Sequence, residues 1–112
     1  MKKELQDKLL NQFPKLYRQY YLTVQESCMP WGFDCPDEWF SAIWELSERI
    51  SQYTETTGIL IEAVQVKEKF GGLRFYYDVV TQSDSVNYDY IHEMILDAEH
   101  KVDKIEGNYN EF

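Results

Sequence analysis

The sequence predicts an α+β fold: a single small domain in which three helices pack on a short antiparallel sheet built around one β-hairpin. Three observations lead to this prediction. Apolar residues recur at helical spacing in three separate segments, two segments within residues 59–80 are rich in β-branched and aromatic residues, and the pair Gly71-Gly72 lies between those two. With 112 residues, 44% of them hydrophobic, the chain can bury a core, so we expect residues 1–112 to form one domain.

The first predicted helix lies near the N-terminus, where apolar residues recur every three or four positions from Leu5 to Tyr20. Pro14 interrupts this pattern. Because proline removes a backbone donor and clashes with the preceding turn, we expect a kink there or a break into two helical pieces. Residues 20–25, YYLTVQ, are β-prone and fit either a short strand or the end of this helix, and their composition favours the strand.

The second predicted helix begins at Pro36, a residue that suits the first helical position, and two acidic residues follow it at the positive end of the helix dipole. Gly58 is placed to end this helix. The third helix is predicted to begin in the cluster Ser83–Ser85, whose side chains can cap free backbone N–H groups, and to end at Gly107.

Between these two helices, Ile59–Lys69 and Leu73–Val80 are predicted strands. Gly71-Gly72 joins them, and such a pair suits the positive φ angles of a two-residue hairpin turn. This turn places Lys69 opposite Arg74 and Phe70 opposite Leu73, and it makes the face with Phe70 nearly all apolar. The opposite face then carries Lys67, Lys69, Arg74 and Tyr76.

The cations on this face need nearby anions, because like charges directly opposite each other destabilise a hairpin. Those anions are either the protein's own acids, such as Glu68, Asp78 or acids from a helix, or an external anion, and the sequence leaves both open. With the ring of Tyr76 beside the cations, the face can hold a phosphate group and stack on a base.

The composition limits the classes of partner. The chain has 20 acidic and 11 basic residues, a formal net charge of -9, which argues against direct nucleic-acid binding because duplex binding relies on Lys and Arg. No secretory signal pattern and no membrane-length apolar run are present, so we expect a cytoplasmic protein with no membrane contact. In that compartment Cys28 and Cys35 are expected to be free thiols, with a disulfide as the alternative.

No residue pattern predicts catalysis, a cofactor or a metal site. His92 and His100 are eight positions apart, which is too far for two ligands one helical turn apart. Neither cysteine stands in a nucleophile signature, so we expect no enzymatic activity. Trp31 and Phe33 lie in the irregular connector CMPWGFDCP, where they either anchor a partner or cover the end of the core.

Two stretches, PWGFDCPDEWFSAIWEL and VQVKEKFGGLRFYYD, resemble a group of small uncharacterised proteins encoded by phages and prophages, with a ribbon motif of the form VKEKFGxLRFY. The resemblance covers about half of the chain. Members often carry further cysteines near the C-terminus that look like a metal knuckle, and residues 78–112 contain none, so the resemblance implies no zinc site here. Small acidic phage proteins are frequently inhibitors of host proteins, including defence systems, and this is what the resemblance implies for function.

These observations predict a non-enzymatic acidic binding protein: a phage-type inhibitor of a host protein, either a defence protein or one whose surface is basic because it binds nucleic acid. The alternative is a small-ligand binder that sequesters a phosphate-bearing metabolite or nucleotide on the basic hairpin. The residues predicted to bind the ligand or partner are Lys67, Lys69, Arg74, Tyr76, Trp31 and Phe33.

Overall fold

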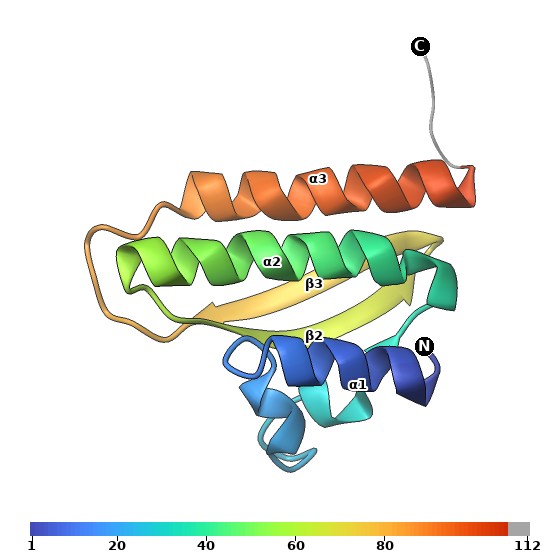
Figure 1. The fold of residues 1–112 in the computed structure, drawn as a ribbon, viewed down its shortest axis with the longest axis horizontal. Helices are drawn as coiled ribbons and strands as arrows, with labels where there is room; N and C mark the ends of the chain where they lie inside the picture. The colour runs from blue at the N-terminus through green and yellow to red at the C-terminus, as the bar shows by residue number, and fades with distance from the viewer. Residues whose placement is uncertain (108–112) are drawn as a thin grey trace.

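The computed structural model describes residues 1–107, and in them three α-helices and three short 3₁₀ helices accompany a three-stranded sheet. The α-helix α2 crosses in front of β2 and β3, with α3 and α1 on either side of it (Figure 1). This arrangement confirms the predicted α+β fold. The elements in chain order are α1 Lys3–Gln12, the 3₁₀ helices η1 Arg18–Tyr21 and η2 Met29–Trp31, β1 Phe33–Asp34, the 3₁₀ helix η3 Asp37–Trp39, α2 Phe40–Thr57, β2 Ile61–Lys69, β3 Gly72–Val79 and α3 Tyr88–Glu106.

The sheet is mixed rather than purely antiparallel. β3 pairs with the central strand β2 in the antiparallel sense, and the two-residue β1 pairs with β2 in parallel, with Phe33 beside Val66. β1 is also tied to the N-terminal segment, because Gln6 Oε1 accepts a hydrogen bond from Phe33 N at 2.7 Å and Met1 N donates to Phe33 O at 3.0 Å. A strand of two residues leaves no alternating pattern in the sequence, which is why β1 was not predicted.

The hairpin turn consists of Phe70 and Gly71, so the predicted Gly71-Gly72 turn is wrong by one position. Both turn residues have positive φ, 55° and 77°, as a two-residue hairpin turn requires, and Lys69 pairs with Gly72. The carboxylate of Glu68 accepts a hydrogen bond from Gly71 N at 2.7 Å. This bond supports the turn at the observed position.

The strand pairing is shifted by two positions from the predicted register, and a shift of two leaves every side chain of β3 on its predicted face. A β-bulge between Ala63 and Gln65 then exchanges the faces in the first part of β2. As a result, Ala63 is buried under the helices, whereas Glu62 lies on the outer face of the sheet opposite Asp78.

The predicted break at Pro14 is confirmed, since α1 ends before it and the chain continues through turns into η1. The predicted strand over residues 20–25 is wrong. These residues form the end of η1 and a turn, and Leu22 N donates to Gln19 O at 3.1 Å. Local hydrogen bonds of this kind take up the backbone donors that a strand would offer to the sheet.

The ends of the two long helices follow local signals. Gly58 and Gly107 cap α2 and α3 with φ angles of 78° and 74°, as predicted. The beginning of α3 differs from the prediction, because the cap is Asn87 and not the cluster Ser83–Ser85. The Asn87 side chain accepts a hydrogen bond from Tyr90 N at 3.0 Å.

The core lies between the helices and the sheet. Its largest fully buried side chains include Tyr17 and Phe33, whose rings pack edge to face with centroids 4.9 Å apart. The Tyr17 hydroxyl donates to Ser47 Oγ at 2.6 Å, because Ser47 gives its own proton to Ile43 O at 2.7 Å. Phe33 is 2% exposed. It is therefore a core residue and offers no surface to a partner, contrary to the prediction.

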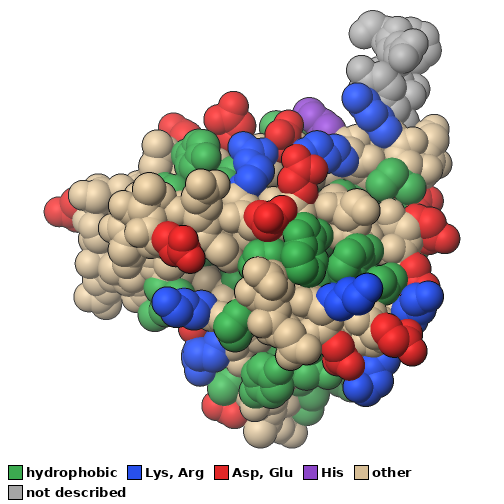
Figure 2. All heavy atoms as spheres, viewed as in Figure 1, with side chains coloured by type: hydrophobic (Ala, Val, Ile, Leu, Met, Phe, Trp, Pro, Cys, Tyr) green, Lys and Arg blue, Asp and Glu red, His purple; other side chains and the backbone are tan. Residues whose placement is uncertain are grey.

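The helical side of the molecule carries charges of both signs. Lys101 Nζ lies 2.7 Å from Glu45 Oε1, and Arg49 Nη1 lies 2.9 Å from Asp97 Oδ2, so two ion pairs link α2 to α3. Figure 2 shows acidic and basic side chains interspersed over this face. The acids Glu45 and Asp97 on α2 and α3 are therefore paired with cations of the neighbouring helix.

Candidate partner-binding surface

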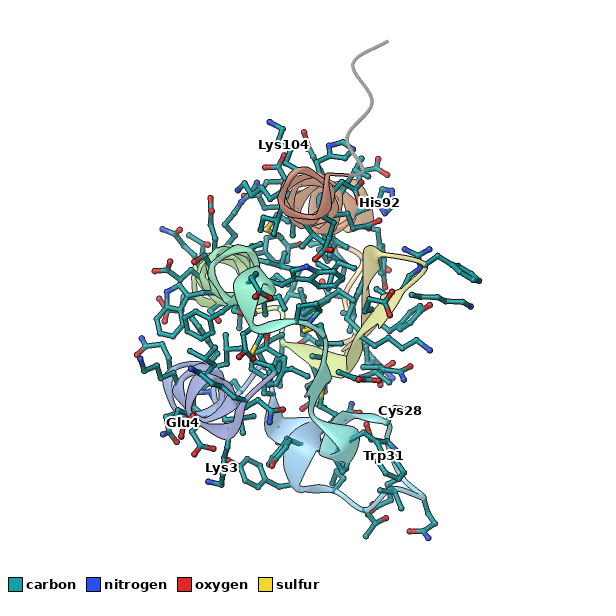
Figure 3. The ribbon with its side chains drawn as sticks, turned by 90° about the vertical axis from the view of Figure 1, so that its right-hand side faces the viewer. Lys3, Glu4, Cys28, Trp31, His92 and Lys104 are labelled. Atoms are coloured by element: carbon teal, nitrogen blue, oxygen red, sulfur yellow. The ribbon has the colours of Figure 1, made fainter. Side chains whose placement is uncertain are left out.

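The outer face of the hairpin brings together four of the six predicted site residues. Alternation along the strands puts their side chains on the side opposite the buried Val66, Leu73 and Phe75. In Figure 3 α1 and α2 lie on the left and α3 lies at the top, and the outer side chains of the hairpin project to the right. This surface is called the hairpin face below, and it consists of Gln65, Lys67, Lys69, Arg74 and Tyr76.

Lys67 and Arg74 lie directly opposite each other on the hairpin face. None of the ion pairs within residues 1–107 includes Lys67, Lys69 or Arg74. Asp34 is the neighbour of Lys67 across the β1–β2 ladder, and it is not part of these pairs either. Cations opposed in this way destabilise a sheet by about 0.2–1 kcal/mol, so the arrangement favours an anion from outside the described chain.

The two acids that the sequence offered as internal partners are engaged elsewhere. Glu68 accepts the hydrogen bond from the turn backbone described above. Asp78 Oδ2 accepts a hydrogen bond from Gln19 Nε2 at 3.2 Å. The guanidinium of Arg74 instead donates to a backbone oxygen, that of Leu73, at 3.2 Å. Of the two explanations left open by the sequence, the structure therefore does not support neutralisation by Glu68 or Asp78.

Phe70 stands at the tip of the hairpin and is 90% exposed. Its φ of 55° is the only positive φ of a non-glycine residue within residues 1–107. Bulky side chains disfavour this left-handed region, where glycine or asparagine is usual. The Lys69 ammonium lies 5.7 Å from the ring centroid, within the range of a cation–π contact. The predicted register had placed Phe70 on the apolar face, so sequence reasoning missed this residue.

Trp31 extends the hairpin face towards η2. It is 73% exposed and borders a cavity of about 310 Å³ between η2 and β2. Gln65 belongs both to this cavity and to the hairpin face, so the two surfaces are continuous. Figure 3 shows Trp31 and Cys28 below the hairpin, on the side towards which its outer side chains project. The residues that line the cavity are Cys28, Trp31, Gly32, Asp34, Gln65 and Val66.

A network of polar side chains holds η1 on the outer face of the sheet. Arg18 donates to Glu62 through Nε at 2.6 Å and through Nη2 at 3.0 Å, and Gln19 Nε2 donates to Glu62 Oε1 at 3.1 Å. The hydrogen bonds from Arg18 hold the pKa of the buried Glu62 carboxyl below its ordinary value. Glu62 is therefore charged at neutral pH and bound to both side chains.

The same network positions Trp31. Ser27 Oγ donates to Gln19 Oε1 at 2.7 Å and accepts a hydrogen bond from Met29 N at 3.1 Å. Because Met29 is buried and begins η2, these bonds fix η2 against β2. The Trp31 side chain thus has a rigid base although it is exposed.

The two cysteines are free thiols. Cys28 is exposed beside the cavity, whereas Cys35 is buried, and burial raises the pKa of its thiol to about 12. Cys28 and His92 lie well apart in Figure 3, so they do not form a nucleophile and base pair. The structure groups no three His, Cys, Asp or Glu side chains of residues 1–107 around a metal position, and no helix in that range is long and apolar enough to span a bilayer.

No protein-family model, curated protein or solved structure matches this chain. What the surface can do therefore follows from its geometry. The hairpin face and its tip present three cations and two aromatic rings, and Trp31 adds a third ring beside them. Arginine and large aromatic side chains are the residues that contribute most to protein interfaces, and cations select a partner of negative charge.

Proposed function

We propose that the protein is a non-enzymatic binding protein that engages a partner protein through its hairpin face. The observation that carries this proposal is the opposition of Lys67 and Arg74, neither of which pairs with an acid of residues 1–107. Opposed cations destabilise the free protein, and an anionic partner removes that repulsion when it binds. The adjoining ring of Tyr76 supplies contact area for the same partner.

The partner that we propose is a host protein, so that the chain acts as a phage-type inhibitor in the host cytoplasm. The support for this part is the resemblance of KEKFGGLRFYYD to the ribbon motif of phage- and prophage-encoded proteins. An inhibitor of this kind needs a binding surface and no catalytic residues. A host defence protein is the first class of target to examine.

Capture from a host lysate tests the hairpin face. A tagged wild type is compared with Lys67→Glu/Arg74→Glu, and captured proteins are identified by mass spectrometry. The control Lys3→Glu/Lys8→Glu makes the same change of charge on exposed residues of α1. We expect the hairpin variant to lose a partner that the control retains, and binding of the purified partner to weaken as salt increases. Equal capture by both variants would exclude the hairpin face.

A partner with a basic surface, as the composition predicts, would use the acids of α2 and α3 instead. Glu48→Lys/Glu93→Lys reverses two exposed acids on these helices and serves as a third arm of the experiment. Loss of the partner from this variant, with full capture by the hairpin variant, would assign binding to the helical side.

A second candidate function is the capture of a phosphate-bearing metabolite or nucleotide. The cavity beside Trp31 favours it, because this cavity is continuous with the cationic hairpin face and Tyr76 can stack on a base. Melting of the wild type with ATP, ADP and pyrophosphate tests this function. A ligand binder is stabilised in proportion to RT ln(1 + [L]/Kd), so an unchanged melting temperature at saturating concentrations would exclude it.

A further inference from the structure

The fold does not require an aromatic side chain at Phe70. A side chain that is 90% exposed buries almost no apolar surface and so adds little to the core. Its φ of 55° is strained for a bulky residue, and asparagine or glycine would form the same turn with less strain. Backbone strain of this kind persists mainly at functional sites.

The hairpin presents this ring on a rigid support. Gly71 N donates a hydrogen bond to Glu68 Oε1 at 2.7 Å, and the ammonium of Lys69 lies 5.7 Å from the centroid of the ring. The β2–β3 ladder is regular from Gln65 to the turn. A side chain that is held in place before binding loses little conformational entropy when a partner covers it.

We propose that Phe70 is the anchor with which the hairpin docks into an apolar pocket of an acidic partner protein. This inference rests on the proposed function and specifies the partner's chemistry: one pocket that accepts a phenyl ring, with carboxylates at its rim. Lys69 flanks the ring, and Lys67 and Arg74 follow it along the strands. Rim carboxylates would therefore pair with cations that take part in no ion pair within residues 1–107. An apolar anchor surrounded by polar contacts is the usual arrangement of an interface hot spot.

A protein fits the tip better than a small ligand does. Phe70 protrudes from the end of the hairpin, and a protruding ring is desolvated only by a concave surface that closes around it. A phosphate compound bound to Lys67 and Arg74 would leave the ring in water. The backbone strain at Phe70 would then contribute nothing to binding.

The test combines two variants of Phe70 with one photochemical probe. Phe70→Asn creates the Asn-Gly pair that two-residue turns prefer, so we expect a higher melting temperature together with binding to the partner weakened by on the order of tenfold or more. Phe70→Leu keeps an apolar side chain and should retain most of the affinity. p-Benzoyl-phenylalanine at position 70, irradiated in host lysate, should form its cross-link at an apolar pocket bordered by Asp or Glu. The same probe at the exposed Tyr21 is the control and should not cross-link there.

The outcomes separate the anchor from the proposed function. If Lys67→Glu/Arg74→Glu loses the partner while Phe70→Asn binds it with full affinity, the hairpin face stands and the anchor is wrong. If neither variant changes binding, both proposals fall. A cross-link to nucleic acid, or to a protein surface without carboxylates, also overturns the anchor. So does a lower melting temperature of Phe70→Asn, because Phe70 would then support the fold.

Discussion

Glu62 and Asp78 form a cross-strand pair of carboxylates on the outer face of β2 and β3, and a single side-chain amide donates a hydrogen bond to each of them. The donor is Gln19 Nε2, at 3.1 Å from Glu62 and 3.2 Å from Asp78. Like charges opposite each other destabilise a sheet, and here Gln19 and Arg18 offset the repulsion. The pair thereby attaches η1 to the sheet.

The first prediction concerns Gln19. Gln19→Leu keeps a similar volume but removes the amide that binds Asp78 and Ser27 and one of the donors to Glu62, so the free energy of unfolding should fall by about 1–3 kcal/mol. Denaturation in urea measures the change. The control Gln52→Leu makes the same substitution at an exposed site on α2 and should change stability by less than about 0.5 kcal/mol. Equal stability of the two variants would show that the network contributes nothing.

The second prediction follows from the pKa of Glu62, which hydrogen bonds from Arg18 hold below the ordinary value of 4.5. Since the folded-state pKa is the lower one, the stabilisation is present above the unfolded pKa and is lost as the pH falls through the folded pKa. Glu62→Gln should therefore be less stable than the wild type at neutral pH, and the difference should shrink as the solution is acidified. Melting temperatures across this range provide the measurement, and a difference independent of pH would contradict the charge on Glu62.

The third prediction tests the opposed cations. In an Asp34→Asn background, which removes the acid beside Lys67 in the β1–β2 ladder, Lys67→Glu places an acid opposite Arg74, so repulsion becomes attraction and the free energy of unfolding should rise by about 0.2–1 kcal/mol at low salt. Lys69→Glu makes the same change opposite Gly72, where no charge faces it across the ladder, and should gain less. The gain at Lys67 should decrease in high salt. Equal gains in the two variants would point to a general effect of charge.

The fourth prediction concerns the thiols. Cys28 is exposed, whereas burial raises the pKa of Cys35 to about 12, and the thiolate is the reactive form. A disulfide reagent such as Ellman's reagent should modify one thiol quickly and the other only as the protein unfolds. Cys28→Ser should remove the fast reaction alone. Two fast thiols, or none in the native protein, would disagree with this arrangement.

The helices were predictable because their signals are local. Pro14, Gly58 and Gly107 each act through the backbone of their own turn, and the structure places the three boundaries where the sequence did. Asn87 was missed because several capping residues precede α3 and the choice among them depends on tertiary packing. Its backbone N–H, for example, donates to Tyr53 Oη at 2.9 Å.

The candidate site was predictable in part, for a different reason. Lys67, Lys69 and Arg74 share a face in any register that differs by an even number of positions, so a wrong turn did not separate them. Which cation faces Arg74 depends on the turn itself, and local preference favours a Gly-Gly turn because a bulky residue such as Phe70 disfavours positive φ, so the observed Phe-Gly turn was not predictable from the sequence. The burial of Phe33 comes from Tyr17, sixteen positions earlier in the chain, and no local pattern indicates that contact.

The central place of β2 has a consequence for how the protein is made. Leu16 O accepts a hydrogen bond from Ala63 N at 2.7 Å, Arg18 binds Glu62, and Phe33 lies beside Val66, so the first third of the chain finds its partners on a strand that is translated much later. On the ribosome the contacts of this segment with the sheet can form only after β2 has emerged, whereas its contacts with α2, such as that of Tyr17 with Ser47, can form earlier. The strand that carries three of the five residues of the hairpin face is thus also the strand on which part of the beginning of the chain folds.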